Sequence, residues 1–222
     1  MKYLIGIDEV GRGSLAGPLL VAAVSLPRGL RLKKGLGKLK DSKKLTALKR
    51  EQWFKFLRSE PKIKFALARV QPRTIERMNV SRAANLAALR AFQGLISNFQ
   101  FPISNCKVLL DGGLYLGNKR GHSQIKRGLT RKISGLRLSA YSERWSARTV
   151  VRGDEKFTSV KLASILAKVS RDRFMGKLGR LYPQYGFEKN KGYATRAHIR
   201  AIRSVGPSEL HRATFIKNFV SV

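Results

Sequence analysis

Short apolar runs of strand length alternate along this chain with segments of helical periodicity. The runs are rich in aliphatic and β-branched residues and end at Gly, Pro or charged residues; they are 3–7, 19–26, 64–71, 106–113 and 146–154. Helical patterns cover about 74–97, a segment that ends near Leu181, and about 195–204. Interleaved strands and helices predict an α/β fold. A Gly-rich turn between the first two runs predicts that they pair antiparallel.

Acidic residues close three of these predicted strands. The chain has five aspartates, and Asp8, Asp111 and Asp154 each end an apolar run with a glycine within two residues. Ligands bind at the strand ends of open α/β sheets, so these carboxylates are expected to converge there. Converging carboxylates repel one another unless cations bind between them. Hard oxygen ligands favour Mg²⁺ or Mn²⁺, and a pair of such ions is suited to phosphodiester hydrolysis. Glu9, beside Asp8, is a further candidate ligand.

The spacing of these acids also allows a structural explanation. A single Asp at the end of a strand is commonly a turn residue or a helix cap. Asp154 stands just before a helical pattern and could cap it, and Asp41 with Ser42 could begin a helix. On spacing alone, both interpretations stay open.

The charge of the chain points to a polyanionic partner. It has 46 Lys and Arg against 13 Asp and Glu, a formal net charge of +33. Such an excess predicts binding to nucleic acid first and to an anionic membrane surface second. No run approaches the roughly 18 apolar residues of a membrane span, and strand pattern begins too early for a signal peptide. One cysteine and three histidines disfavour a Cys- or His-based metal site. We therefore expect a cytoplasmic protein without a membrane partner.

Several motifs resemble those of ribonuclease HII, the bacterial type 2 ribonuclease H family, and they occur in family order over most of the chain. They are GIDEVGRGSLAGPLLVAAV (6–24, beginning at Gly6), LKDSKKLT (39–46), VLLDGG (108–113), RGDEKFTSVKLASILAKVSRDRFM (152–175), YPQYGFEKNKGYATRAH (182–198) and GPSELHRATF (206–215). The resemblance implies a ribonuclease-H-like mixed sheet flanked by helices. It implies a catalytic domain over 1–181 and a small helical part over 182–222 that contacts the substrate.

The resemblance also implies an activity. Enzymes of this family hydrolyse the RNA strand of RNA–DNA hybrids and nick duplex DNA on the 5′ side of an embedded ribonucleotide. The family's four metal-binding acids fall on Asp8, Glu9, Asp111 and Asp154. They are expected to hold divalent ions, Mg²⁺ or Mn²⁺, and the implied mechanism uses two of them.

The residues that contact substrate are implied by the same alignment of motifs. The family's Gly-Arg-Gly motif falls on Gly11, Arg12 and Gly13, whose backbone is expected to contact the ribose 2′-OH and neighbouring phosphates. Its substrate-sensing tyrosine falls on Tyr193. Its phosphate-contacting loop falls on Ser42, Lys43 and Lys44. Taken singly, each of these residues could instead be an ordinary turn, an ordinary aromatic or solvated charge.

The chain departs from the family pattern mainly between its third and fourth acids, where 42 residues intervene. The surplus is a basic insertion at about 117–145, and its part at 117–137 has seven Lys or Arg and no acid. We expect this part to be a basic arm that grips duplex backbone, with a solvated loop as the alternative. Val10, Ser14 and Thr214 are milder departures.

Two other functions remain compatible with the sequence. A non-catalytic basic nucleic-acid-binding protein would explain the charge, but it would leave the acids at the strand ends unexplained. A nuclease of the same fold with another substrate would explain both. In each case we expect a monomer.

Overall fold

The computed structural model describes residues 3–32, 35–99, 106–116 and 146–220. Its centre is one sheet with the strand order β3-β2-β1-β4-β5. The strands are β1 (Tyr3–Val10), β2 (Leu19–Pro27), β3 (Lys64–Val70), β4 (Cys106–Asp111) and β5 (Ser146–Val150). Neighbouring strands β1, β2 and β3 are antiparallel, whereas β1, β4 and β5 run parallel. The prediction of an α/β fold with antiparallel pairing at its start is confirmed.

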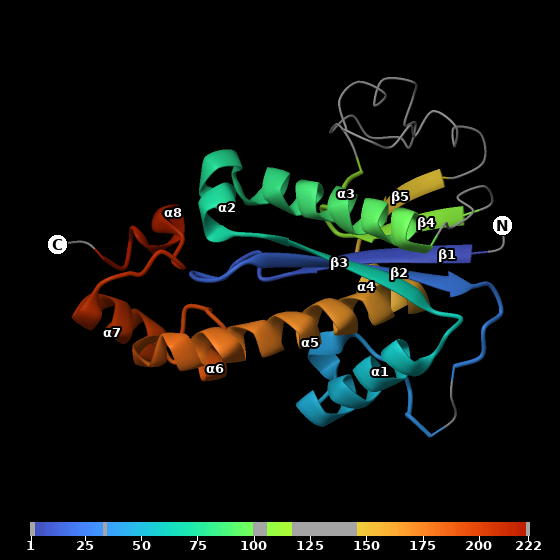
Figure 1. Cartoon of the computed structure of the whole chain (residues 1–222), viewed down its shortest axis with the longest axis horizontal. Coiled ribbons are helices and arrows are strands. Elements are labelled where there is room, and N and C mark those ends of the chain that lie inside the picture. Colours follow the sequence, from blue (N-terminus) through green and yellow to red (C-terminus); the bar gives the residue numbers. More distant parts are fainter. Residues whose placement is uncertain (1–2, 33–34, 100–105, 117–145, 221–222) are drawn as a thin grey trace.

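Helices cover both faces of this sheet (Figure 1). On one face lie α2 (Pro72–Met78) and α3 (Val80–Phe99); on the other lie α1 (Ala47–Ser59) and the long α5 (Thr158–Leu181). Short helical turns η1 (Ser42–Lys44) and α4 (Gly153–Lys156) precede α1 and α5. The mixed sheet flanked by helices therefore matches the ribonuclease-H-like arrangement that the motifs implied.

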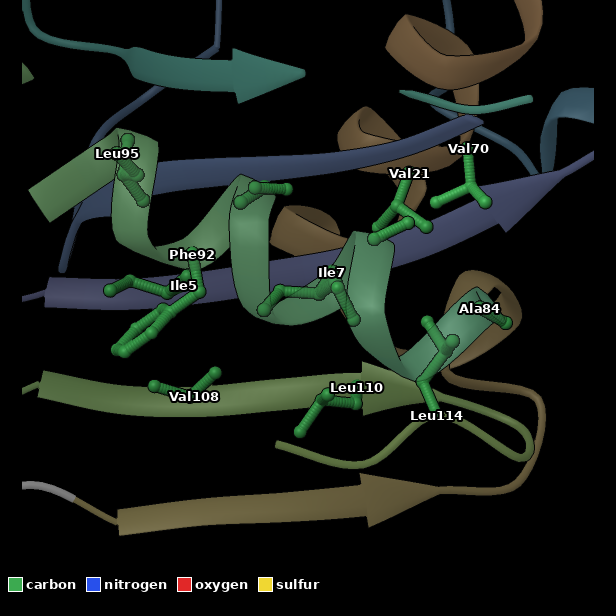
Figure 2. Packing of buried hydrophobic residues seen from close by; sticks show 14 of the residues in the cluster. Ile5, Ile7, Val21, Val70, Ala84, Phe92, Leu95, Val108, Leu110 and Leu114 are labelled. Atoms are coloured by element: carbon green, nitrogen blue, oxygen red, sulfur yellow. The ribbon is translucent and has the colours of Figure 1, made fainter. Parts of the chain in front are cut away.

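The core on the α3 side follows from the two periods of strand and helix. Ile5 and Ile7 alternate along β1 and face α3, where alanines at three- and four-residue spacing let the helix lie close to the sheet. Figure 2 shows Phe92 and Leu95 of α3 above Ile5 and Val108. Burying these side chains stabilises the fold by about 1.5–3 kcal/mol each for the larger ones. Strand β1 is thus fixed in the middle of the molecule.

The opposite face of β1 is where α5 approaches most closely. A methyl group placed on Gly6 would lie 2.2 Å from the backbone carbon of Ser159, at the start of α5. Because side chains alternate along a strand, Asp8 lies on the same face as Gly6 and is directed toward α5. Glycine at this position therefore brings α5 close to the acid that follows it on β1.

The chain after α5 packs at the end of the sheet toward which β1 runs (Figure 1). It contains η3 (Pro183–Tyr185), α6 (Phe187–Asn190), α7 (Arg196–Val205) and α8 (Ala213–Ile216). Their buried residues form a separate apolar cluster with Leu15, Ala16 and Met175. Backbone hydrogen bonds join this part to the loop after β1: the amides of Leu15 and Ala16 donate to the Gly192 carbonyl, at 2.8 and 3.1 Å.

Three sequence predictions need correction or fall outside the structure. The helix predicted over 74–97 is two helices, because Asn79 takes a positive φ of 66° between α2 and α3. Asp154 does not end a strand; β5 stops at Val150 and Asp154 lies in the first turn of α4. The whole basic insertion at 117–145, including the proposed arm at 117–137, lies outside the described residues.

Candidate active site

Three carboxylates meet where β1, β4 and α4 come together. Oxygen atoms of Asp8, Asp111 and Asp154 all lie within 4.8 Å of one another. Parallel pairing of β1 with β4 brings the first two together, since both strands run to the same edge of the sheet. Such a cluster of oxygen ligands has the composition that Mg²⁺ and Mn²⁺ prefer.

The backbone after β5 places the third acid. Arg152 adopts a left-handed conformation, with φ of 54°, and turns the chain into α4. The Gly153 amide then donates to Oδ1 of Asp111 at 2.6 Å, and the Asp154 amide lies 3.4 Å from the same oxygen. Asp111 therefore caps α4 and is held beside Asp154 by the same bonds. The helix-cap alternative raised for Asp154 applies instead to Asp111.

Burial and mutual repulsion act on these acids together. Asp8 is 5% exposed and Asp154 is 6% exposed. Burial raises the pKa of Asp8 well above its ordinary value, and the charges of Glu9 and Asp111 add to the rise. Burial, followed by the charge of Asp111, also raises the pKa of Asp154. The ionised cluster is therefore costly by itself, and a bound cation would relieve that cost.

Glu9 lies next to Asp8 near the end of β1 and lines the same pocket as Asp8. Its Oε1 accepts from the guanidinium of Arg12 at 3.2 Å, while its Oε2 is buried without a hydrogen-bond partner. Burial raises the pKa of Glu9, and the bond from Arg12 opposes that rise. Arg12 also donates to the Ser81 hydroxyl at 2.9 Å, which ties the loop to α3. The unpartnered Oε2 atom of Glu9 is therefore available to bind one more group.

Asp8, Glu9 and Asp111 line one pocket of about 330 Å³ together with most of the predicted substrate contacts. The lining residues are Asp8, Glu9, Val10, Gly11, Arg12, Gly13, Ser42, Lys43, Asp111, Ser164, Lys168 and Tyr193. Residues separated by up to 185 positions in the sequence, such as Asp8 and Tyr193, thus meet at one surface. Asp154 borders the same cluster through its proximity to Asp8 and Asp111.

Two buried arginines hold the Gly11–Gly13 loop. Arg212 is fully buried and donates to the carbonyls of Gly11 and Arg12, at 2.7 and 2.8 Å. Arg171 is also fully buried and donates to the Ser14 hydroxyl at 2.8 Å. Position 11 requires glycine, because φ is +84° and a Cβ would lie 2.2 Å from Nε of Arg171. Hydrogen bonds from the two buried arginines therefore hold the loop in place from the protein interior, and the loop amides remain available to a ligand.

Of the three residues predicted to contact phosphate, Ser42, Lys43 and Lys44, not all lie at the pocket. Asp41 caps η1 by accepting from the Lys43 amide at 3.0 Å, so the predicted helix start at Asp41 is confirmed. Lys43 reaches toward Asp154, with Nζ 3.9 Å from its carboxylate. Lys44 points elsewhere and pairs with Glu155 at 2.9 Å. Among Ser42, Lys43 and Lys44, only the first two line the pocket.

Tyr193 also lines the pocket, from the turn between α6 and α7. Its ring is half-buried, and the guanidinium of Arg171 lies 5.4 Å from the ring centre. The ammonium of Lys168 lies 5.9 Å from the same centre. Contacts of this kind with cations help to hold an aromatic ring in place.

Sequence reasoning did not single out Ser164, Lys168, Arg171 or Arg212. The Ser164 hydroxyl opposes the rise in the pKa of Asp8, and it shares a 2.8 Å hydrogen bond with Ser42. The basic residues gave no signal of their own. The chain has 46 Lys and Arg, and nothing in the sequence distinguishes Arg171 and Arg212, the two that are buried among the described residues. A helical-wheel reading of α5 could have placed Ser164, Lys168 and Arg171 on one face, at spacings of four and three residues.

Comparison with known proteins settles the family. The profile of the family described as ribonuclease HII matches residues 5–218. The chain belongs to the ribonuclease HII family. It is 37% identical over 219 residues to ribonuclease HII of Caldicellulosiruptor saccharolyticus, covering 99% of this chain and 89% of that one. It is 34% identical over 214 residues to ribonuclease HII of Bacillus subtilis, covering 96% and 69%. The resemblance of the motifs is thus confirmed, and the chain is a type 2 ribonuclease H.

Solved structures agree on the fold. Ribonuclease H2 of Pyrococcus horikoshii superimposes with a TM-score of 0.66 at 21% identity, over 98% of this chain and 97% of that one. The Mn²⁺ complex of Bst-RNase HIII gives 0.68 at 20% identity, over 98% and 69%. A ribonuclease HII from Archaeoglobus fulgidus, solved with PCNA, gives 0.62 at 25% identity, over 94% and 93%. The ribonuclease-H-like fold is confirmed. Because the family is enzymatic, the alternative of a non-catalytic binding protein is wrong.

Proposed function

We propose that this enzyme nicks duplex DNA on the 5′ side of an embedded ribonucleotide, and cleaves the RNA strand of RNA–DNA hybrids, with two divalent metal ions. The observation that carries the proposal is the meeting of the acidic cluster, the Gly11–Gly13 loop and Tyr193 at one pocket. Family membership supports an endonuclease acting on RNA in hybrids. The finer specificity for single ribonucleotides rests on the pocket.

The acids are suited to hold the ions. Asp8, Asp111 and Asp154 offer oxygens within 4.8 Å of one another, and Glu9 has an oxygen without a partner. When bound, Mg²⁺ or Mn²⁺ would supply charge neutralisation and an activated water for hydrolysis. The Mn²⁺ complex of Bst-RNase HIII, which shares the fold, supports an ion of this kind. We assign the four acids as the residues that would hold the metal ions, with Asp8 contributing from the middle of the sheet.

The loop and the tyrosine are suited to recognise the ribose. A protein distinguishes RNA from DNA at one nucleotide only by contact with the 2′-OH. Gly13 leaves its side of the loop open to such a contact, since nothing lies within 4 Å of a Cβ placed there, whereas Gly11 lets the buried Arg171 approach the loop from the other side. Tyr193, held by Arg171 and Lys168, offers a ring on which a sugar can pack. Lys43 adds an exposed positive charge for phosphate, and Ser42 fixes the turn that carries it.

The test is cleavage of four end-labelled duplexes: DNA with one ribonucleotide, an RNA–DNA hybrid, all-DNA and all-RNA. Each is incubated with Mg²⁺, with Mn²⁺ and with a chelator. We expect a single nick 5′ to the ribonucleotide, cleavage of the hybrid, and no product from all-DNA or with chelator. Equal cleavage of all-DNA would favour the alternative nuclease. Cleavage of the RNA–DNA hybrid but not of the DNA duplex with one ribonucleotide would refute the finer specificity.

Two further expectations stay predictions. These are that the chain acts as a monomer and that it is cytoplasmic. No helix among the described residues has the length and apolar character needed to span a membrane. The division into a catalytic domain at 1–181 and a substrate-contacting part at 182–222 is likewise proposed, and α5 ends at Leu181.

A further inference from the structure

A buried pair of histidines lies directly behind Tyr193 and has no part in the proposed chemistry. His198, on α7, is fully buried, and His211, in the segment before α8, is 7% exposed. Their Nε2 atoms lie 3.1 Å apart. Nδ1 of His198 lies 2.9 Å from the Tyr193 carbonyl oxygen. At the other end, the Ser208 amide donates to Nδ1 of His211 at 3.0 Å.

The two ends of this chain of bonds decide where each proton lies. The Tyr193 carbonyl can only accept, so Nδ1 of His198 carries a hydrogen. The Ser208 amide can only donate, so Nδ1 of His211 carries none. The Ser208 hydroxyl, also 3.0 Å from Nδ1 of His211, is then a second donor to that nitrogen. A neutral His211 has its hydrogen on Nε2 and donates it to the bare Nε2 of His198. The bonds therefore run in one direction, from Ser208 through His211 and His198 to Tyr193, and both rings are neutral.

The surroundings favour the neutral rings. Burial lowers the pKa of His198, and burial followed by the charge of His198 lowers the pKa of His211 to about 4. A backbone hydrogen bond with Ser208, followed by the exposed Glu209 carboxylate, opposes the second shift without cancelling it. Tyr185 and Phe187 pack against both rings, with centroids 4.7 to 6.4 Å away. At neutral pH the pair therefore keeps this direction of donation.

The same short segment also holds the loop that faces Tyr193. His211 pairs with Ala16 in an isolated β-bridge, and the Arg212 amide donates to the Leu15 carbonyl at 2.8 Å. The Arg212 side chain holds the Gly11 and Arg12 carbonyls. Residues 208–212 are thus bonded to both walls of the proposed ribose site, the loop directly and Tyr193 through the histidines.

We propose that His198 and His211 are positioning residues that fix Tyr193 against the Gly11–Gly13 loop for recognition of the ribonucleotide. The inference rests on the proposed contact between Tyr193 and the substrate. Without the bond from His198, the Tyr193 carbonyl keeps only the Thr195 amide, at 2.8 Å, and the ring loses one support of its position. Small displacements of a positioning group lower the rate more than they lower affinity.

The decisive comparison is kinetic. His198→Leu removes the donor and keeps an apolar side chain, whereas His198→Asn keeps an amide donor near the position of Nδ1. On a duplex with one ribonucleotide we expect His198→Leu to lower kcat about 10-fold with KM changed less than 3-fold. His198→Asn should recover kcat to within about 3-fold of the unmodified enzyme. Equal loss of kcat in both variants would overturn the relay, by which we mean the chain of hydrogen bonds from Ser208 through His211 and His198 to Tyr193. The loss would then come from the altered packing of the side chain and not from the missing hydrogen-bond donor.

A double-mutant cycle separates this inference from the function beneath it. If the histidines act through Tyr193, His198→Leu should lower kcat no further in a Tyr193→Ala background. Additive losses would overturn the relay and leave the contact of Tyr193 standing. An unaltered rate for Tyr193→Ala alone would overturn both.

A measurement on the unmodified enzyme needs no variant to fold. Imidazole ¹⁵N spectra at pH 7 should show the Nδ1–H form for one buried histidine and the Nε2–H form for the other, both neutral. The chain has three histidines, so His122 is the remaining signal. Two buried rings in the same tautomer, or either one protonated, would overturn the relay.

Discussion

Asp8→Asn should lower the cleavage rate at saturating Mg²⁺ on the order of 10³-fold, because several kcal/mol of metal-dependent stabilisation are lost at 1.36 kcal/mol per tenfold in rate. Asp8 is one of the three acids whose oxygens lie within 4.8 Å of one another, together with Asp111 and Asp154. Asparagine has nearly the same shape but only one neutral oxygen to offer. Single-turnover cleavage of a duplex with one ribonucleotide measures the loss.

The same substitution should not weaken folding. Folding raises the pKa of Asp8 well above its ordinary value of 3.8. Between these two pKa values the folded form binds more protons than the unfolded form, so stability is lost as the pH rises through this range. The ionised group therefore opposes folding at neutral pH, and removing its charge relieves that cost. Without metal, we expect Asp8→Asn to melt at or above the temperature of the unmodified enzyme. Added Mg²⁺ should raise the melting temperature of the unmodified enzyme more than that of the variant.

A matched control is Glu51→Gln, which removes one negative charge from the exposed pair with Arg173 on the surface between α1 and α5. Its cleavage rate should stay within about 2-fold of the unmodified enzyme, because exposed ion pairs contribute little. Duplex binding by Asp8→Asn should also be kept, since a negative charge is removed from a site for phosphate. A rate for Asp8→Asn within a few-fold of normal would refute its assignment as a metal ligand.

The strand ends could be predicted because local sequence determines them. An apolar run followed by an acid and a glycine is a local pattern, and it located Asp8 and Asp111 near the ends of β1 and β4. Asp154 was grouped with them by the same pattern, but a left-handed Arg152 ends β5 early and moves Asp154 onto α4. The carboxylate still reaches the cluster, so the predicted convergence held although the predicted element did not.

The parts that could not be predicted depend on burial and on distant contacts. Arg171 and Arg212 look like any other basic residue in the sequence, yet both are fully buried under the loop that follows β1. His198 and His211 were taken only as too few for a metal site, since nothing local shows that they meet at 3.1 Å. The break at Asn79 interrupts a continuous helical pattern through one positive φ. Composition and periodicity do not report such pairings.

Gly6→Ala should destabilise the enzyme by about 3 kcal/mol or more, because overpacking against a rigid neighbour costs 1–3 kcal/mol and here the neighbour is backbone. The added methyl group would lie 2.2 Å from the Ser159 carbon, 2.3 Å from its oxygen and 2.4 Å from the Val160 amide nitrogen. No side-chain rotation can relieve these contacts. Helix α5 would have to move away from β1.

The same movement would disturb the active site. Gly6 and Asp8 share one face of β1, and α5 carries Ser164, which lines the same pocket as Asp8 and opposes the rise in its pKa. We therefore expect Gly6→Ala to lower the cleavage rate even at temperatures where the variant remains folded. Urea unfolding gives the change in free energy, and single-turnover cleavage below the melting transition gives the change in rate.

Gly176→Ala is the matched control, since it makes the same chemical change on α5 at a position where nothing lies within 4 Å of the added Cβ. There alanine should stabilise by about 0.5–1 kcal/mol through its higher helix propensity and leave the rate unchanged. The two substitutions should thus act in opposite directions on stability. A Gly6→Ala variant within about 0.5 kcal/mol of the unmodified enzyme, the usual range for harmless substitutions, would show that α5 does not depend on this glycine for its approach to the acid on β1.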